Sequence, residues 1–413
     1  MRLNSYLSQF CIAVLALALA GCGSSTSSNT PKPSGLKKRA WLSNTSTNTV
    51  NLLDAQKDVF STNSVGASSP TKMVTASGTT VVMDSAGSQI TVIDNPTEAV
   101  TFVAPIGDQP FDLALSADGK TAWTAQRNFG FVQSVNTTNG VANPVIRIGN
   151  ARRLALSPKG TKLLVFPDPQ TQVAPDTSTF FVVDTASGGV TTITDAVHLD
   201  EPFTAVFNGS ETQAFVLNCG PECGGTAASV VSVDFTNPVP NFSATLAVPG
   251  ATVGLLNGSN LYVAGTAAPA TGPGLACPLS RCGALTVINV TAFTAGAPIP
   301  ITDGDHEKMA FANNRLYVGA LGCTVDPGST TNSVRGCLSI FNTSSPGTKF
   351  PEESSFRQNF DVTGLQPISG RSVIYIVQGA ELDIFDTNTD ALAAGVTQLD
   401  VVGKAFDVVL IDP

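Results

Sequence analysis

The sequence predicts an all-β fold, an eight-bladed β-propeller, from three observations. A short apolar segment that ends in Asp or Asn recurs eight times, at intervals of 40 to 55 residues. A second apolar segment precedes each copy, and tight turns that contain Gly or Asn join most of these to a third. The repeats show no helical period, so each unit is predicted to be a small antiparallel sheet, and such units at this spacing are typical of propellers.

The repeated segments define the strands of each unit, which we name A to D in chain order. The A strand is LALS at residues 113–116 and again at 154–157, and the B strand that follows is TAWTA at 121–125 and KLLVF at 162–166. The D strand is weaker and includes VTFVAPIG at 100–107. Asp and Asn suit the turn after a strand, because their side chains hydrogen-bond nearby backbone amides. The C strands end at Asp54, Asp94, Asn136, Asp184, Asp234, Asn289, Asn342 and Asp386.

The two ends of the domain predict how the ring closes. A four-stranded sheet cannot bury both faces alone, so the units must stack around an axis. The domain begins with a B strand at 40–42 and ends with an A strand at 406–411. Both ends should therefore build one blade, which closes the ring and leaves no open sheet edge. Eight C strands predict eight blades, and seven is the alternative if one degenerate unit is displaced.

The repeat also resembles a known family. The sequence LALSADGKTAWTAQ at 113–126, together with VIDNPT-type and IPVG-type strands, is similar to the YVTN-repeat, lactonase-like β-propellers. The resemblance covers roughly residues 40–413 and is clearest at 79–166. It implies a propeller whose A strands line the central channel, and it leaves function open, because propellers support many activities.

The N-terminus resembles a bacterial lipoprotein signal peptide over residues 1–21. Its apolar run, residues 10–20, is short for a membrane span and ends in Leu-Ala-Gly before Cys22. This lipobox-like sequence implies palmitate on Cys22 and a lipid anchor in the cell envelope. The resemblance to such lipoproteins also implies the outer membrane rather than the inner one, because position 23 is Gly and not Asp. The alternatives are an ordinary secretory signal and an N-terminal anchor helix.

The domain boundaries and the charge follow from the rest of the chain. Residues 22–39 are predicted to be the lipidated cysteine and a flexible linker, because Ser, Thr and Pro dominate residues 23–35, and residues 40–413 are predicted to be the propeller.

The formal charge is −9, and removal of the signal peptide takes away Arg2 and no acid, which leaves −10. An acidic domain is repelled by phosphates, so nucleic acid is not expected as a partner. The expected partners are the membrane, through the anchor, and a protein, glycan or small molecule; we expect a monomer.

Six cysteines in the folded region form local pairs. Each pair falls inside or at the edge of one B–C connection, in three successive units. An even number of cysteines in an exported chain predicts disulfides, and of the 15 pairings that six cysteines allow, sequence proximity favours one. A metal site built from these pairs is the alternative, but no histidine accompanies them. The favoured bonds are Cys219–Cys223, Cys277–Cys282 and Cys323–Cys337.

The D–A connections hold both histidines and an acidic group. His198 lies in TDAVHLDEP and His306 in TDGDHEKM. Oxygen ligands and imidazole are common cation donors, so a divalent cation is the one cofactor that the second segment could hold. A polar loop without a metal is the alternative. The candidate metal ligands are Asp303, Asp305, His306 and Glu307.

Two arginines are candidates for ligand binding. Arg152 and Arg153 enter an A strand, where an inward arginine could face the channel and attract an anion. One solvated and one paired arginine is the alternative. His198 is the third candidate for ligand binding.

The loops predict a binding function. No GxSxG, HExxH or P-loop motif occurs, and no catalytic residue can be named. In up-and-down blades the B–C and D–A connections emerge on one face, and the longest B–C loops are 167–178, 219–229, 266–283 and 321–336. We therefore expect a binding or scaffold protein that uses this face. A lactonase-like or other hydrolytic enzyme, with a cation or an acid/base pair at the channel mouth, is the alternative; acidic D–A residues that converge on one point would favour it.

Overall fold

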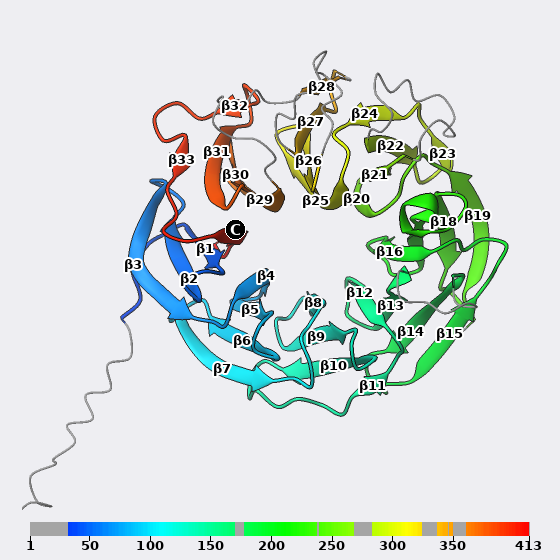
Figure 1. Cartoon of the computed structure of the whole chain (residues 1–413), viewed down its shortest axis with the longest axis horizontal. Helices are drawn as coiled ribbons and strands as arrows, with labels where there is room; N and C mark the ends of the chain where they lie inside the picture. The colour runs from blue at the N-terminus through cyan, green and yellow to red at the C-terminus, as the bar shows by residue number, and fades with distance from the viewer. Residues whose placement is uncertain are drawn as a thin grey trace, which may run out of the picture.

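Eight antiparallel sheets form a closed ring around a central channel (Figure 1). This is a computed structural model that describes residues 32–169, 177–237, 239–267, 283–323, 337–345, 347–349 and 361–412. The ring confirms the predicted all-β, eight-bladed propeller and excludes the seven-bladed alternative.

The strands of the first four blades follow the A-to-D order, except that the A strand of blade 1 is the last strand of the chain. Blade 1 contains β1 (Arg39–Asn44), β2 (Thr49–Asp54), β3 (Val59–Gly66) and β34 (Ala405–Leu410). Blade 2 contains β4 (Pro70–Ala76), β5 (Thr79–Asp84), β6 (Gln89–Asp94) and β7 (Ala99–Pro105). Blade 3 contains β8 (Asp112–Leu115), β9 (Thr121–Gln126), β10 (Phe131–Asn136) and β11 (Ile146–Arg147). Blade 4 contains β12 (Ala151–Leu156), β13 (Lys162–Pro167), β14 (Thr179–Asp184) and β15 (Val190–Thr194).

The remaining blades repeat this order, and two of them split the outer strand. Blade 5 contains β16 (Pro202–Phe207), β17 (Gln213–Asn218), β18 (Ser229–Asp234) and β19 (Asn241–Ala247). Blade 6 contains β20 (Val253–Asn257), β21 (Asn260–Thr266), β22 (Gly283–Asn289), β23 (Thr294–Ala295) and β24 (Ile299–Ile301). Blade 7 contains β25 (Asp305–Ala312), β26 (Arg315–Leu321), β27 (Leu338–Asn342) and β28 (Thr348–Lys349). Blade 8 contains β29 (Val362–Ile368), β30 (Val373–Gln378), β31 (Glu381–Asp386), β32 (Ala391–Leu392) and β33 (Gln398–Leu399).

The two ends of the domain close the ring in blade 1, as predicted. Strand β34 pairs antiparallel with β1, in a register that places Ala40 opposite Leu410. Arg39 adds an ion pair to Asp412, with its Nε 2.8 Å from a carboxylate oxygen. Closure therefore supplies partners for backbone groups that would otherwise lie on two open sheet edges.

Part of the segment before β1 contacts the propeller. The Ser34 amide and hydroxyl donate hydrogen bonds to the Glu98 carboxylate at 2.8 and 2.6 Å. Glu98 also pairs with Arg39, and Leu36 packs against the apolar cluster between blades 1 and 2. The chain is thus attached to the ring from about Ser34, and β1 begins at Arg39, one residue before the predicted start of the domain.

The core consists of eight apolar clusters among the described residues, each between two neighbouring blades. Trp41 of blade 1, for example, packs against Met73 and Val82 of blade 2. The B strands are the most buried, as in β5, where only the first residue is partly exposed. Removal of each fully buried Leu, Val or Phe side chain from water stabilises the ring by about 1.5–3 kcal/mol.

The A strands line the channel and define two faces. Each A strand contacts the A strand of the next blade all the way round the ring (Figure 1). We call the face with the B–C and D–A connections the loop face, and the face with the A–B and C–D connections the turn face. Because every A strand begins on the loop face, the first residues of the A strands surround the channel mouth there.

The turn face is built from short turns, and the A–B turn of blade 3 shows how. Ser116 accepts a backbone hydrogen bond from Gly119 at 2.8 Å, and its hydroxyl donates to Asp118 at 2.6 Å. Gly119 has φ +72°, and a Cβ there would come within 2.6 Å of the Ala76 carbonyl of blade 2. Glycine is therefore required both by the turn and by the neighbouring blade. Within the described part of the chain, no helix has the length and apolarity needed to cross a membrane.

Candidate functional site

A cavity of about 360 Å³ opens in the channel at the loop face. Residues at or just before the starts of the A strands of six blades line it, together with residues at the ends of B strands. The charged lining residues are Lys72, Asp112, Arg152, Arg153, Glu307 and Lys308. A smaller space of about 70 Å³ adjoins this cavity on the side of blades 4 to 7. The larger one is within the size range of small-molecule sites.

An ion pair crosses the channel between the two spaces. Arg153 is the third residue of β12 in blade 4, and its Nη2 donates to the Glu307 carboxylate of β25 in blade 7. Arg152 and Glu307 line both spaces and so form their boundary. The Arg152 and Arg153 guanidinium groups also lie 5.6 and 5.1 Å from the centre of the Phe203 ring. The predicted inward arginines therefore do face the channel.

Two aspartates in a repeated Phe-Asp sequence join neighbouring blades. Asp112 accepts a hydrogen bond from the Leu154 amide of blade 4 at 2.8 Å. Asp407 accepts one from the Met73 amide of blade 2 at 2.9 Å. Burial raises the pKa of Asp112, but the charges of Lys72 and Arg153 lower it more, so the net shift is downward. Both aspartates thus fasten one A strand to the next.

Lysines complete these two aspartate sites from the channel side. Lys72 Nζ lies 2.5 Å from Asp112, and Lys308 Nζ lies 3.2 Å from Asp407. Lys308 of blade 7 thus contacts Asp407 of blade 1. In blade 8 between them, the β34 backbone passes close to Gly364, where a Cβ would lie 3.2 Å from the Asp407 Cα. Four cations and two carboxylates line the larger cavity. The carboxylates of Asp168 and Asp407, which pair with Arg152 and Lys308, are buried behind its wall.

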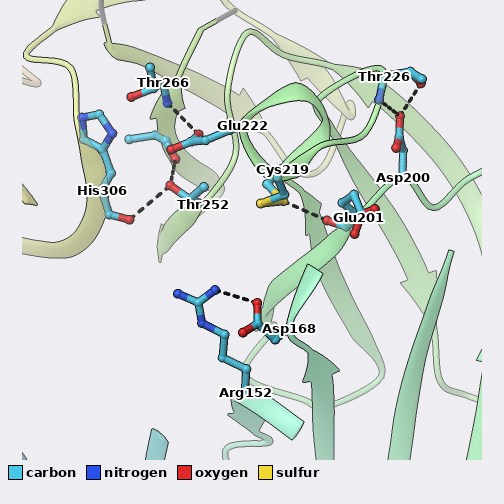
Figure 2. The surroundings of a disulfide bond; sticks show 12 residues. Arg152, Asp168, Asp200, Glu201, Cys219, Glu222, Thr226, Thr252, Thr266 and His306 are labelled. Atoms are coloured by element: carbon cyan, nitrogen blue, oxygen red, sulfur yellow. Dashed lines mark hydrogen bonds and ion pairs between the residues drawn. A yellow bond between two sulfur atoms is a disulfide. The ribbon is translucent and has the colours of Figure 1, made fainter. Parts of the chain in front are cut away.

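Asp168 holds two arginines at the edge of the site. Its fully buried carboxylate lies 3.1 Å from Arg152 Nη1 and 2.5 Å from Arg127 Nη1 (Figure 2 shows the first contact). Arg127 in turn lies over the Phe111 ring at 4.1 Å. These contacts fix the positions of Arg152 and of the aromatic wall formed by Phe111.

The candidate metal ligands do not converge. We expected His306 in a D–A connection, but β25 already begins at Asp305, and strand alternation turns His306 into the blade, where it is 1% exposed. Its Nε2 donates to the Thr302 carbonyl at 2.9 Å, and Glu307 pairs with Arg153 instead. Burial lowers the pKa of His306 to about 4, although the bond to Thr302 partly offsets it. Among the described residues, no group of three or more His, Cys, Asp or Glu could hold a metal ion.

His198 also lies away from the channel cavities. Its Nδ1 is 2.9 Å from an Asp195 carboxylate oxygen, and its ring stacks on Phe242 at 5.2 Å. Neither cavity includes it. The contacts of His198 therefore order its own D–A connection.

The structure contains two of the predicted disulfides. Cys219–Cys223 encloses the 3₁₀ helix η2 (Gly220–Cys223), whose Glu222 accepts a hydrogen bond from the Thr266 amide of blade 6 at 2.8 Å (Figure 2). Cys323–Cys337 closes the B–C connection of blade 7, and both of its cysteines are buried in the core. The predicted lipidation site Cys22 and the predicted bond Cys277–Cys282 lie outside the described residues.

A buried glutamate on the loop face was not singled out from the sequence. Glu201 is 4% exposed, and its Oε2 has no hydrogen-bond partner. Burial, and then the charge of Asp200, raise the pKa of Glu201 to about 7. Asp200 itself accepts hydrogen bonds from Thr226 and Ala227 (Figure 2 shows the first). No local pattern indicates which of two adjacent acids will be the unpaired one.

Apolar side chains project from the loop face. Phe129, Val197 and Val402 are 63%, 86% and 87% exposed, and each lies in a B–C or D–A connection. The turn face also has an exposed apolar residue, Val239, which is 74% exposed in a C–D connection. It also has a hollow of about 340 Å³ beside Lys159. Exposed apolar residues alone therefore do not distinguish the faces; the channel cavities do.

Comparison with solved structures shows the fold alone. The dihydro-heme d1 dehydrogenase NirN in complex with DHE matches at a TM-score of 0.64 and 11% identity, over 90% of this chain and 75% of NirN. Apo AztD from Citrobacter koseri matches at 0.59 and 10%, over 91% and 98% of the two chains. BamB from Moraxella catarrhalis matches at 0.54 and 12%, over 81% and 89%. At these identities the likeness supports a β-propeller and assigns no activity.

Sequence comparisons add no family. No protein-family model matches the chain. No curated protein matches it either. The similarity to YVTN-repeat propellers therefore stays a resemblance in sequence, and the architecture it implied is present.

Proposed function

We propose that this chain is an extracytoplasmic binding protein, tethered to the envelope through Cys22, whose loop face contacts a small ligand, protein or glycan. One observation carries the proposal: the channel opens on the loop face into a cavity where cations outnumber acids. Both described disulfides lie in B–C connections of the same face. Function on a rigid scaffold is usually carried by such loops.

The arrangement of the acidic residues favours binding over hydrolysis. A hydrolytic site at the channel mouth needs a cation or an acid and a base close together. His306 instead faces the core, Glu307 pairs with Arg153, and Asp305 is exposed. The acidic D–A residues therefore lack the convergence on one point that would favour a hydrolytic enzyme.

The loop face can be tested against the turn face with matched substitutions. The triple variant Phe129→Ser, Val197→Ser, Val402→Ser removes apolar groups from the loop face, and Val239→Ser removes one of similar exposure from the turn face. We expect the triple variant to lose a partner that copurifies from detergent-solubilised host envelopes, and the control to keep it. Loss in the control alone would contradict the proposal.

The tether is tested separately by cell fractionation. Lipid attachment needs the Cys22 thiol, and residues 23–35 would then hold the ring near the membrane. We expect Cys22→Ser to move the protein from the membrane fraction to the soluble fraction. Unchanged membrane retention would show that Cys22 is not the anchor.

A further inference from the structure

We propose that the larger channel cavity binds a small organic carboxylate with an apolar body, and that the Glu307 carboxylate occupies the ligand's position in the free protein. This inference rests on the proposed binding function and names the chemical class of the ligand. It is argued from the contacts of the charged groups around the cavity.

The aspartates beside the cavity are used within the ring. Asp112 accepts hydrogen bonds from the Leu113 and Leu154 amides at 2.9 and 2.8 Å, as well as from Lys72. Asp407 accepts them from the Met73 and Val408 amides and from Lys308. A carboxylate has about four lone-pair sites, so little of either aspartate is left for a ligand.

The lysines, in contrast, keep donors for a ligand. An ammonium group has three N–H donors, and the side chain of Lys72 makes one hydrogen bond among the described residues, to Asp112. Lys308 likewise makes one, to Asp407. Their side chains are 35% and 26% exposed, and both line the cavity. Two cations with spare donors therefore face a common space, which Phe406 also lines.

Glu307 is the exchangeable carboxylate. It pairs with Arg153 across the channel and, unlike Asp112 and Asp407, it fastens no pair of neighbouring blades. Its side chain is 30% exposed, so it can turn to solvent without becoming a buried unpaired charge. Arg153 Nε has no partner in the free protein, so Glu307 satisfies the guanidinium incompletely. A ligand carboxylate can approach the same fork in a bidentate geometry.

The apolar walls of the cavity favour a ligand whose carboxylate is attached to an apolar group. Phe111, Phe406, Met83, Leu321 and Val362 share the lining with the cations. An inorganic anion would leave these side chains in contact with water and gain nothing from them. A flat ring next to the carboxylate would bury them, at about 25 cal/mol per Å² of apolar surface.

The test uses three probes on the full-length Cys22→Ser protein, measured by isothermal titration calorimetry. The probes are naphthalene-2-carboxylate, its neutral carboxamide and inorganic phosphate. We expect the carboxylate to bind at least tenfold more tightly than the other two, because a charge-assisted hydrogen bond contributes more than one factor of ten. Equal binding of carboxylate and carboxamide, tighter binding of phosphate, or no binding of any probe at millimolar concentration would overturn the inference.

Two substitutions at one ion pair should shift the affinity in opposite directions. Glu307→Gln removes the internal competitor, so the carboxylate should bind about tenfold more tightly, whereas Arg153→Gln should weaken it about tenfold. Lys72→Gln repeats the second test if the arginine variant folds poorly. Lys159→Gln, an exposed lysine beside the turn-face hollow, should change the affinity less than twofold.

The direction of these shifts decides the site. If Glu307→Gln and Arg153→Gln shift the affinity in the same direction, or if Lys159→Gln weakens binding most, the carboxylate site is not the channel cavity. Failure of the probes with an intact partner interaction in the loop-face test would overturn this inference and leave the proposed function standing.

Discussion

Glu201 and Glu211 lie just beyond the two ends of strand β16, on the loop face and the turn face respectively. Both are buried, at 4% and 5% exposure, and both have left-handed backbones with φ of 55° and 63°. The Glu211 carboxylate accepts hydrogen bonds from the Lys159 amide and the Thr161 hydroxyl of blade 4. Glu201, in contrast, has a carboxylate oxygen with no partner.

The difference shows that the two faces satisfy their buried groups differently. On the turn face, a short turn and a carboxylate fasten neighbouring blades together. On the loop face, polar side chains at the ends of B strands hold the D–A connections. The Asn44 side chain donates to the Val402 carbonyl at 2.8 Å, and the Asn218 side chain donates to the His198 carbonyl at 2.8 Å. Because these hydrogen bonds come from side chains, the D–A connections can differ in length and can contain an unsatisfied charged group. Functional surfaces usually have both properties.

The largest effect should come from opening the ring, which both faces depend on. Deletion of residues 405–413 removes β34 and leaves the edge of β1 unpaired. Each buried unpaired backbone group costs about 1–3 kcal/mol, against a total stability of roughly 5–15 kcal/mol. We expect an insoluble or molten product by circular dichroism and thermal melting. A truncated protein that melts cooperatively near the parent temperature would refute this closure.

The disulfides of the loop face should differ in their effects. Replacement of Cys323 and Cys337 by Ala should lower the free energy of unfolding by about 3 kcal/mol, because the bond closes the longer loop, and the buried sulfur atoms add to the loss. Replacement of Cys219 and Cys223, which are four residues apart, should cost about 2 kcal/mol. Urea unfolding compares the two pairs, and the reverse order would show that chain entropy does not govern these bonds.

His306 should make stability depend on acid pH. Its pKa is lowered to about 4 in the folded state, against 6.5 when unfolded. Between these values the unfolded chain binds a proton that the folded chain does not, so stability falls as the pH is lowered through this range. The loss should reach about 2–3 kcal/mol near pH 4.5. His306→Gln should lack this part of the pH dependence. If the urea midpoints of the parent and of the variant changed with pH in the same way, the assignment to His306 would be contradicted.

The two glutamates should respond in opposite directions at alkaline pH. The folded pKa of Glu201 is raised to about 7 from 4.5, so stability falls as the pH rises from about 4.5 to about 7. Glu201→Gln should therefore stabilise the protein by about 1–3 kcal/mol at pH 8 and little at pH 5. Burial raises the pKa of Glu211, but its hydrogen bonds, from Thr161 first, lower it more. Glu211→Gln should therefore destabilise the protein at pH 8. If both variants changed the free energy of unfolding at pH 8 in the same direction, the proposed difference between the two faces would be contradicted.

The repeats predicted the ring because a blade is a local structure. The Asp and Asn residues that end the C strands mark one position in each unit, and the ends of the chain complete blade 1. The site was predictable only in part. Arg152 and Arg153 belong to an A strand, but the partner Glu307 is 154 residues from Arg153, and no local pattern connects them. The orientation of His306 depends on whether β25 begins before or after it, which composition does not determine.

The central claim, that the loop face is the contacting surface, is tested most directly by photo-crosslinking in the living host. A photoreactive phenylalanine replaces Val197 on the loop face or Val239 on the turn face. The two valines are 86% and 74% exposed; Val197 follows β15, the outer strand of blade 4, and Val239 precedes β19, the outer strand of blade 5. The account predicts a discrete crosslinked adduct from position 197 and none from position 239. An adduct from position 239 with none from position 197 would contradict it.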